Sequence, residues 1–350
     1  MNFPRNQKPL ELVELEIFSK NIGSNIELVQ GSGGNISIKI DNNLWIKASG
    51  KKLRNCLSEN IFLPLDQAAL QEQIDNNQFE FSAIKLLVDA DFKNLRPSIE
   101  LGLHALIPRK YVAHLHPIGL LSILVGSNIK EKIEKFYSCD EYLLVPYKKP
   151  GEGLTQYLNS ARKIRNLPKL VFLANHGVVI SGETLSDIEI SLSKIVDTFS
   201  QNSAPRVQVK LDLIQLLTAK TTWHLPIFDE VQLLAQDKAI LKRALSGILF
   251  PDHIVFLGNS IHSVPAKAGD LISWLSQPTI KDLPYLIVPQ LGVLTNPNLS
   301  QDGHELLLAW YRILREIPEG EKINYLHANE INDIDQWEAE AYRRGLSIDQ

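Results

Sequence analysis

Two histidines one residue apart close a predicted β-strand, and this pattern constrains the fold more than any other. Residues 111–116 are mainly apolar and β-favouring, His114 and His116 stand at the end of the run, and Pro117 stops it. Side chains alternate faces along a strand, so residues i and i+2 point the same way and both imidazoles can meet one ion. The sequence therefore predicts a strand that ends in part of a metal site.

A third histidine, His176, ends a second strand-like run at 169–176. Three imidazoles suit zinc, or another divalent metal that favours imidazole, and leave a fourth position for water, substrate or a carboxylate. A His-x-His pair alone is a weak signal, because most such pairs in soluble proteins bind nothing. Glu100, which precedes the pair, strengthens the case. We therefore expect a metalloenzyme.

The composition is that of an ordinary globular protein. The chain has 350 residues, of which 44% are hydrophobic and 22% charged, and its formal net charge is −4. This balance gives no support to nucleic-acid binding, which favours a basic domain. No apolar run approaches the roughly 20 residues of a membrane span, and the first residues lack the apolar core of a signal peptide. Two cysteines cannot form a disulfide framework. We therefore expect a cytoplasmic protein that binds neither nucleic acid nor membrane.

Hydrophobic periodicity predicts the elements around these residues. Glu100 and His104 lie four apart in one expected helix, so they should share a helical face. The strands expected at 35–40 and 44–48 flank a turn at 41–43 and form a hairpin. Helices are expected at 10–22, 99–107 and 184–196, and strands at 35–40 and 44–48.

A polar stretch without periodicity at 201–205 marks a domain boundary. We expect a metal-binding domain at 1–204 and a C-terminal α/β extension of unknown role at 205–350. In the extension, helices alternate with short buried strands, which is typical of an α/β unit. Helices are expected at 237–244, 270–275, 304–315 and 337–344, and strands at 253–257 and 285–288.

Three polar turns carry glycine or serine near these elements. The turn at 31–35 is neither a phosphate-binding P-loop nor a dinucleotide fingerprint, because Ile36 stands where the fingerprint needs its third glycine. Adjacent glycines can still direct backbone N–H groups toward an anion. Ser49 and Gly50 close the far end of the hairpin, and Ser98 comes shortly before Glu100. The three turns could converge on one anion, although each is also consistent with an ordinary turn.

Five motifs, taken together in their order and spacing, resemble those of the class II aldolase/adducin family. They are Gly31-Ser-Gly-Gly-Asn35-Ile-Ser, Leu44-Trp-Ile-Lys-Ala-Ser49-Gly50, Pro97-Ser98-Ile-Glu100-Leu-Gly-Leu-His104, His114-Leu-His116-Pro117 and Asn175-His176-Gly177. The second motif and Val145-Pro-Tyr-Lys-Lys-Pro150-Gly are similar to the aldolase half of bifunctional rhamnulose-phosphate aldolase/alcohol dehydrogenases. The resemblance implies an α/β fold: a three-layer class II aldolase-like domain with a central, mainly antiparallel sheet flanked by helices, plus a smaller C-terminal α/β region.

The resemblance also implies a role for individual residues. His114, His116 and His176 match the zinc ligands of the family, and Glu100 matches the carboxylate that lies at the metal and moves protons. The implied cofactor is Zn²⁺ or another divalent metal, and the implied partner is a small sugar phosphate. The positions that match the phosphate-holding residues are Ser32, Gly34, Asn35, Ser49, Gly50 and Ser98.

The implied activity is that of a metal-dependent lyase, the reversible aldol cleavage of a ketose phosphate to dihydroxyacetone phosphate and an aldehyde. Two alternatives remain open: a sugar-phosphate epimerase or dehydratase that uses the same enolate, and a non-catalytic adducin-like interaction module. Relatives build the site between subunits, so a homotetramer or another homo-oligomer is expected. Candidates for a second acid are Tyr111, Tyr137, Tyr142 and Tyr147.

Overall fold

The computed structural model describes residues 8–81, 84, 86–87, 95–200, 208–265, 269–339, 342 and 345. The chain divides into two compact units. The first consists of Met1–Leu124 and Asn128–Ser200, and the second of Val125–Ser127 and Gln201–Gln350. The boundary expected at 201–205 lies outside the described residues.

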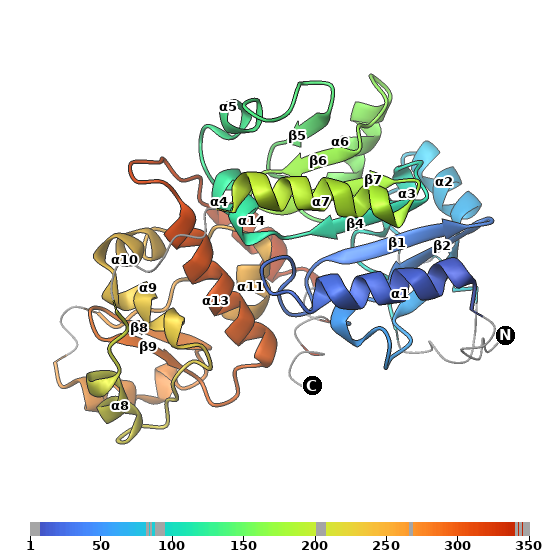
Figure 1. Ribbon diagram of the computed structural model, residues 1–350. Coiled ribbons are helices and arrows are strands. Elements are labelled where there is room, and N and C mark those ends of the chain that lie inside the picture. The colour runs from blue at the N-terminus through green and yellow to red at the C-terminus, as the bar shows by residue number, and fades with distance from the viewer. Residues whose placement is uncertain are drawn as a thin grey trace. The chain divides into compact units, whose positions relative to one another are not determined.

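A seven-stranded sheet forms the centre of the first unit (Figure 1). Every pair of neighbouring strands is antiparallel except β5 and β6. The expected central, mainly antiparallel sheet is thereby confirmed. In spatial order the strands are β3 (Phe62–Asp66), β2 (Asn43–Lys47), β1 (Asn35–Ile40), β4 (Tyr111–Leu115), β7 (Gly177–Gly182), β6 (Leu170–Leu173) and β5 (Tyr142–Val145).

Helices cover both faces of this sheet, so the first unit has three layers (Figure 1). Two separate apolar clusters fill the spaces between the layers. The alternation along β4 divides its side chains between them: Ala113 and Leu115 belong to one cluster, and Val112 to the other. The first cluster includes residues of α1 (Leu10–Gly23), α4 (Ile118–Leu124), α5 (Ile129–Ile133) and α7 (Leu185–Phe199), and the second includes residues of α2 (Gln67–Asp75), α3 (Leu101–Leu106) and α6 (Glu152–Arg162).

Local sequence signals explain where these elements begin. Thr184 starts α7 with a capping box, in which its side chain accepts from the backbone of Asp187 and the Asp187 side chain accepts in return. The helix expected at 99–107 is shorter in the structure, because Glu100 stands at the N-cap of α3 with non-helical φ and ψ of −95° and 18°. The side chain of Glu100 is therefore placed by the start of the helix rather than by a helical face.

The described residues of the second unit are mainly helical and contain one antiparallel β-hairpin. A strand was expected at 253–257, and this prediction is wrong, because these residues lie in helix α11. Pro251 starts that helix, and burial of every residue in it leaves no helical periodicity in the sequence. The strand expected at 285–288 is confirmed, and the helix expected at 337–344 lies partly outside the described residues. The elements are α8 (Asp212–Thr218), the 3₁₀ turn η3 (Asp229–Gln232), α9 (Leu233–Gln236), α10 (Lys238–Ala244), α11 (Pro251–Leu257), α12 (Leu271–Leu275), η4 (Pro278–Ile280), β8 (Tyr285–Val288), β9 (Gly292–Thr295), α13 (Gln301–Glu316) and α14 (Ala328–Asp335).

None of the helices in the described part of the chain combines the length and the apolar character that crossing a bilayer requires.

Candidate metal centre

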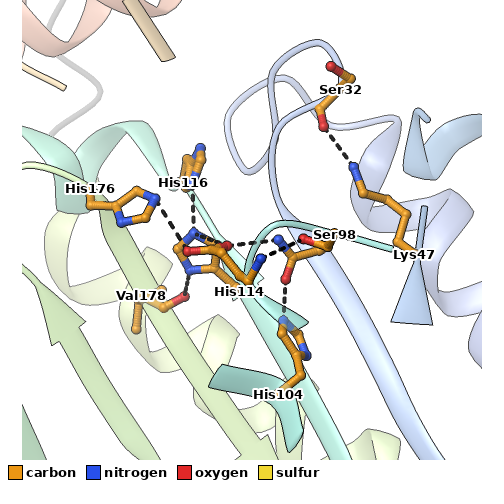
Figure 2. A network of polar contacts seen from close by, with 10 residues as sticks. Ser32, Lys47, Ser98, His104, His114, His116, His176 and Val178 are labelled. Carbon is orange, nitrogen blue, oxygen red and sulfur yellow. Dashed lines mark hydrogen bonds and ion pairs between the residues drawn. The ribbon is translucent and has the colours of Figure 1, made fainter. Parts of the chain in front are cut away.

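Three buried histidines converge where β4 ends beside the turn between β6 and β7 (Figure 2). The ligand atoms of His114, His116 and His176 all lie within 4.8 Å of one another. The strand-like run expected at 169–176 is shorter in the structure, since β6 ends at Leu173. Asn175 adopts a left-handed φ of 56° in the following turn, and this turn brings His176 back toward β4.

A hydrogen bond sets the tautomer of His114. Its Nδ1 lies 3.2 Å from the carbonyl oxygen of Val178 (Figure 2). A carbonyl oxygen only accepts, so Nδ1 carries the proton and Nε2 keeps its lone pair. That Nε2 lies 2.9 Å from Nε2 of His116 and 3.3 Å from Oε2 of Glu100. Metal-binding histidines commonly donate their second ring N–H to a backbone carbonyl in this way.

Close packing around the cluster requires a glycine at position 177. A Cβ atom there would clash with the carbonyl oxygen of Leu115 and would lie 2.8 Å from Cδ2 of His116. Neighbours cannot approach a real Cβ so closely without moving. The motif Asn175-His176-Gly177 therefore has three parts. His176 supplies the imidazole, Asn175 makes the left-handed turn, and Gly177 lets the backbone approach β4.

Glu100 faces the histidines from the N-cap of α3. Its Oε2 lies 3.3 Å from Nε2 of His114, and its Oε1 lies 3.7 Å from Nε2 of His176. The side chain is buried, and its backbone N–H donates to Oγ of Ser98 at 3.3 Å. The structure thus brings the carboxylate and the three imidazoles singled out from the sequence into one buried site.

Asn35 links Glu100 to a fourth histidine. It lies opposite His114 in the ladder between β1 and β4, and its Nδ2 donates to Oε2 of Glu100 at 2.8 Å. Its Oδ1 is hydrogen-bonded to Nε2 of His104, whose Nδ1 lies 2.7 Å from Oγ of Ser37. Burial, with smaller electrostatic effects of His114 and Lys39, holds the pKa of His104 well below its usual value. His104 is therefore neutral, and both ends of the Asn35 carboxamide are engaged inside the protein.

A buried lysine ties the glycine turn to the end of β2. Nζ of Lys47 donates to the carbonyl oxygen of Ser32 at 2.7 Å (Figure 2). It also donates to the carbonyl oxygen of Lys51 at 2.7 Å. Only 2% of Lys47 is exposed. Reasoning from the sequence did not single it out, although a charged residue inside an otherwise apolar strand is the signal that could have done so. Its Nζ therefore links the glycine turn to the turn after β2 through two backbone carbonyls.

The other two turns lie beside each other at the same end of β2. The backbone N–H of Ser49 donates to the carbonyl oxygen of Arg96 at 2.8 Å, which places Ser49 near Ser98. Oγ of Ser49 is buried and has no hydrogen-bond partner within the described part of the protein. Gly34 and Gly50 have φ values of 59° and 74°, a left-handed region that favours glycine. Hydrogen bonds thus gather segments from all three expected turns.

Three of the four candidate tyrosines pack away from the histidines. Tyr111, Tyr137 and Tyr142 belong to the apolar cluster under α1 and α7. The alternation in β4 directs His114 to the opposite face, because its neighbour Leu115 belongs to that same cluster. Tyr147 follows β5 and is half-buried.

Solved structures resemble part of this chain at low sequence identity. The N-terminal class II aldolase domain of a conserved protein from Thermoplasma acidophilum is 24% identical, covers 56% of this chain and 95% of its own, and has a TM-score of 0.46. YgbL from Klebsiella pneumoniae, a putative aldolase/epimerase/decarboxylase by its description, is 19% identical, covers 59% of this chain and 96% of its own, and has a TM-score of 0.41.

Sequence comparison covers more of the chain. A protein of Bacillus subtilis (strain 168), described as the uncharacterized oxidoreductase YuxG, is 29% identical over an alignment of 320 residues, and the match covers 86% of this chain and 44% of that protein. The chain thus spans less than half the length of this relative. The family model described as the class II aldolase and adducin N-terminal domain matches residues 21–195, as the five motifs predicted. The chain therefore belongs to the class II aldolase/adducin family.

Proposed function

We propose that the protein is a metal-dependent lyase that reversibly cleaves a ketose phosphate to dihydroxyacetone phosphate and an aldehyde. One observation carries this proposal: the Glu100 carboxylate lies against a buried cluster of three histidines. Family membership supports it. The three turns that hydrogen bonds gather at the end of β2 support a phosphorylated substrate.

The three imidazoles fit a divalent metal. The lone pair of His114 Nε2 faces the other ring nitrogens, and a backbone carbonyl holds its second nitrogen in the protonated form. His114, His116 and His176 would hold Zn²⁺ or another cation that favours imidazole. Once bound, the cation supplies a Lewis acid that stabilises negative charge developing on substrate oxygens.

Glu100 is the proton carrier in this proposal. In the cleavage direction the hydroxyl group on the β-carbon loses its proton and becomes the aldehyde oxygen as the Cα–Cβ bond breaks. The other fragment is left as an enediolate, which must take up a proton at carbon to become product. A carboxylate within reach can give that proton, and in the reverse direction it can remove it. Asn35 holds Oε2 of Glu100, while Oε1 faces His176. We assign the transfer to Oε1.

The three turns would hold the substrate phosphate. Lys47 keeps the glycine turn beside the end of β2 through its hydrogen bonds to the carbonyl oxygens of Ser32 and Lys51. The buried hydroxyl of Ser49 and backbone N–H groups in the left-handed turns suit an anion. We assign Ser32, Gly34, Ser49, Gly50 and Ser98 to the phosphate, whereas the side chain of Asn35 serves Glu100. Phosphate binding away from the reacting bond lends binding energy to orientation.

The decisive test is carbon–carbon bond formation. The zinc-loaded protein is incubated with dihydroxyacetone phosphate and a series of short aldehydes, and new ketose phosphates are quantified by mass spectrometry. We expect a product with at least one aldehyde and about one zinc ion per chain. Failure with every aldehyde, together with epimerisation or dehydration of a sugar phosphate, would replace the lyase by one of the alternatives.

A further inference from the structure

Four buried side chains form a continuous hydrogen-bonded chain behind the candidate proton carrier. Oγ of Ser37 lies 2.7 Å from Nδ1 of His104, whose Nε2 is hydrogen-bonded to Oδ1 of Asn35. Nδ2 of Asn35 lies 2.8 Å from Oε2 of Glu100. No member is more than 5% exposed. Figure 2 shows His104 below the histidine cluster, linked to it through this chain.

Hydrogen-bond chemistry gives the chain one direction. An ionised carboxylate only accepts, so Asn35 must turn its NH₂ group toward Glu100 and its carbonyl toward His104. Nε2 of His104 must then carry the proton, which leaves Nδ1 to accept from the hydroxyl of Ser37. Each donor therefore meets an acceptor from Ser37 to Glu100. Reversing any one member would put two donors or two acceptors face to face.

This series of hydrogen bonds also joins strand β1 to helix α3. Ser37 and Asn35 lie two residues apart on β1, so they share one face of the sheet. His104 lies in α3, one turn after Glu100, and its backbone N–H donates to the carbonyl oxygen of Glu100 at 3.2 Å. The backbone at Glu100 has already left helical geometry, so the helix alone does not fix its side chain. The hydrogen bond from Asn35 does.

We propose that Asn35 and His104 are positioning residues that hold Oε2 of Glu100 and thereby fix the orientation of its carboxylate, which leaves Oε1 to exchange the proton. Ser37 supports them by fixing the tautomer of His104. This inference rests on the proposed role of Glu100 as proton carrier. It separates Asn35 from the residues that bind phosphate: loss of its side chain should impair proton transfer rather than substrate binding.

Substitutions in the hydrogen-bonded series from Ser37 to Glu100 test the proposal in the zinc-loaded protein. His104→Leu and Asn35→Leu should lower kcat by about 10- to 100-fold, the range expected when a reacting group is misplaced by roughly 1 Å. The KM for dihydroxyacetone phosphate and the zinc content should change little. His104→Gln keeps an N–H donor for Asn35 and should restore kcat to within about fivefold of the wild type.

A control on the same helix separates positioning from general destabilisation. Leu106 is buried in α3 and takes no part in the chain of hydrogen bonds. Leu106→Ala should lower the melting temperature at least as much as His104→Leu and leave kcat unchanged. Equal losses of kcat in these two variants, or a kcat for His104→Gln no higher than that for His104→Leu, would overturn the proposal. A rise in KM without a fall in kcat for Asn35→Leu would return that residue to phosphate binding.

A second measurement does not depend on activity. The ¹⁵N chemical shifts of the His104 ring report its tautomer, and we expect a protonated Nε2 and an unprotonated Nδ1 in the wild type. Asn35→Leu removes the acceptor and should allow the other tautomer. A protonated Nδ1 in the wild-type protein would refute the chain of hydrogen bonds even if the protein proves to be an active lyase. The expected tautomer in a protein without lyase activity would instead locate the failure in the proposed function.

Discussion

Both units of the protein bury histidines, but they surround them differently. In the first unit, three imidazoles turn their nitrogens toward one another and toward Glu100. In the second, His253 is fully buried among aromatic rings, with ring centroids 4.7 Å from Trp310 and 6.3 Å from Tyr285. The difference teaches that burial alone does not mark a functional histidine. The groups that face its ring nitrogens do.

Backbone position explains the contrast. The histidines of the first unit come from a strand end, the residue after it and a turn, so side chains from separate segments can point to one place. His253 lies inside α11, which packs against α13 and α14. The rings of Phe250, Tyr285 and Trp310 surround it, and the Tyr285 hydroxyl lies 3.5 Å from its Nε2. Burial, with a smaller effect of the nearby His262, lowers the pKa of His253 to about 3. A neutral imidazole in that place is part of the core.

Removing the metal ligands should have the largest effect. We expect the His114→Ala/His116→Ala/His176→Ala variant to lose nearly all of the bound zinc, because none of the three imidazoles of the metal site remains. His253→Phe should keep the wild-type content. Metal analysis after dialysis measures both, and full zinc in the triple variant would end the distinction between the two sites.

Replacing the carboxylate should have the next largest effect. Glu100→Gln keeps the shape of the side chain and removes its ability to carry a proton, so turnover should fall by roughly 100-fold or more. Zinc content should stay at the wild-type level, since the three imidazoles remain. Steady-state kinetics with parallel metal analysis tests this, and unchanged turnover would make Glu100 a structural group like His253.

Gly177→Ala tests whether the first site depends on close backbone approach. The added methyl group meets Leu115 and His116, and the overpacking should cost about 1–3 kcal/mol of unfolding free energy. Gly153→Ala is the matched control, because its Cβ would have its nearest neighbour, Lys149, at 3.8 Å. It should stay within about 0.5 kcal/mol of the wild type in denaturant titrations. Equal stability of the two variants would show that the turn can move.

The smallest effect concerns His253 and the pH dependence of stability. Its folded pKa of about 3 lies below the unfolded value of 6.5, so between these values the unfolded chain binds the extra proton. The contribution of the neutral His253 to stability should therefore be complete above pH 6.5. As the pH falls below 6.5, the unfolding free energy should fall by about 1.4 kcal/mol per pH unit. Unfolding free energies from pH 7 to pH 5 should fall less steeply in His253→Phe. Identical slopes would mean that His253 reaches solvent or another proton donor.

Local patterns were enough to predict much of the first unit. The alternation in 111–116 placed His114 and His116 on one face, because a strand has a period of two residues. The motifs identified Glu100 and His176, and the hairpin signals located β1 and β2. The strand predicted at 253–257 failed for a physical reason: a run that is buried on every side shows neither period.

Tertiary structure alone decided which of these residues meet. The pairing of β1 with β4 sets Asn35 opposite His114, and the packing of α3 on that face brings His104 to Asn35. The left-handed turn at Asn175 directs His176 toward β4, and Lys47 crosses to the glycine turn. Sequence spacing determined the face on which each side chain lies, since that depends on local backbone geometry. Its partner across the sheet depends on strand order and register, which contacts between distant segments establish.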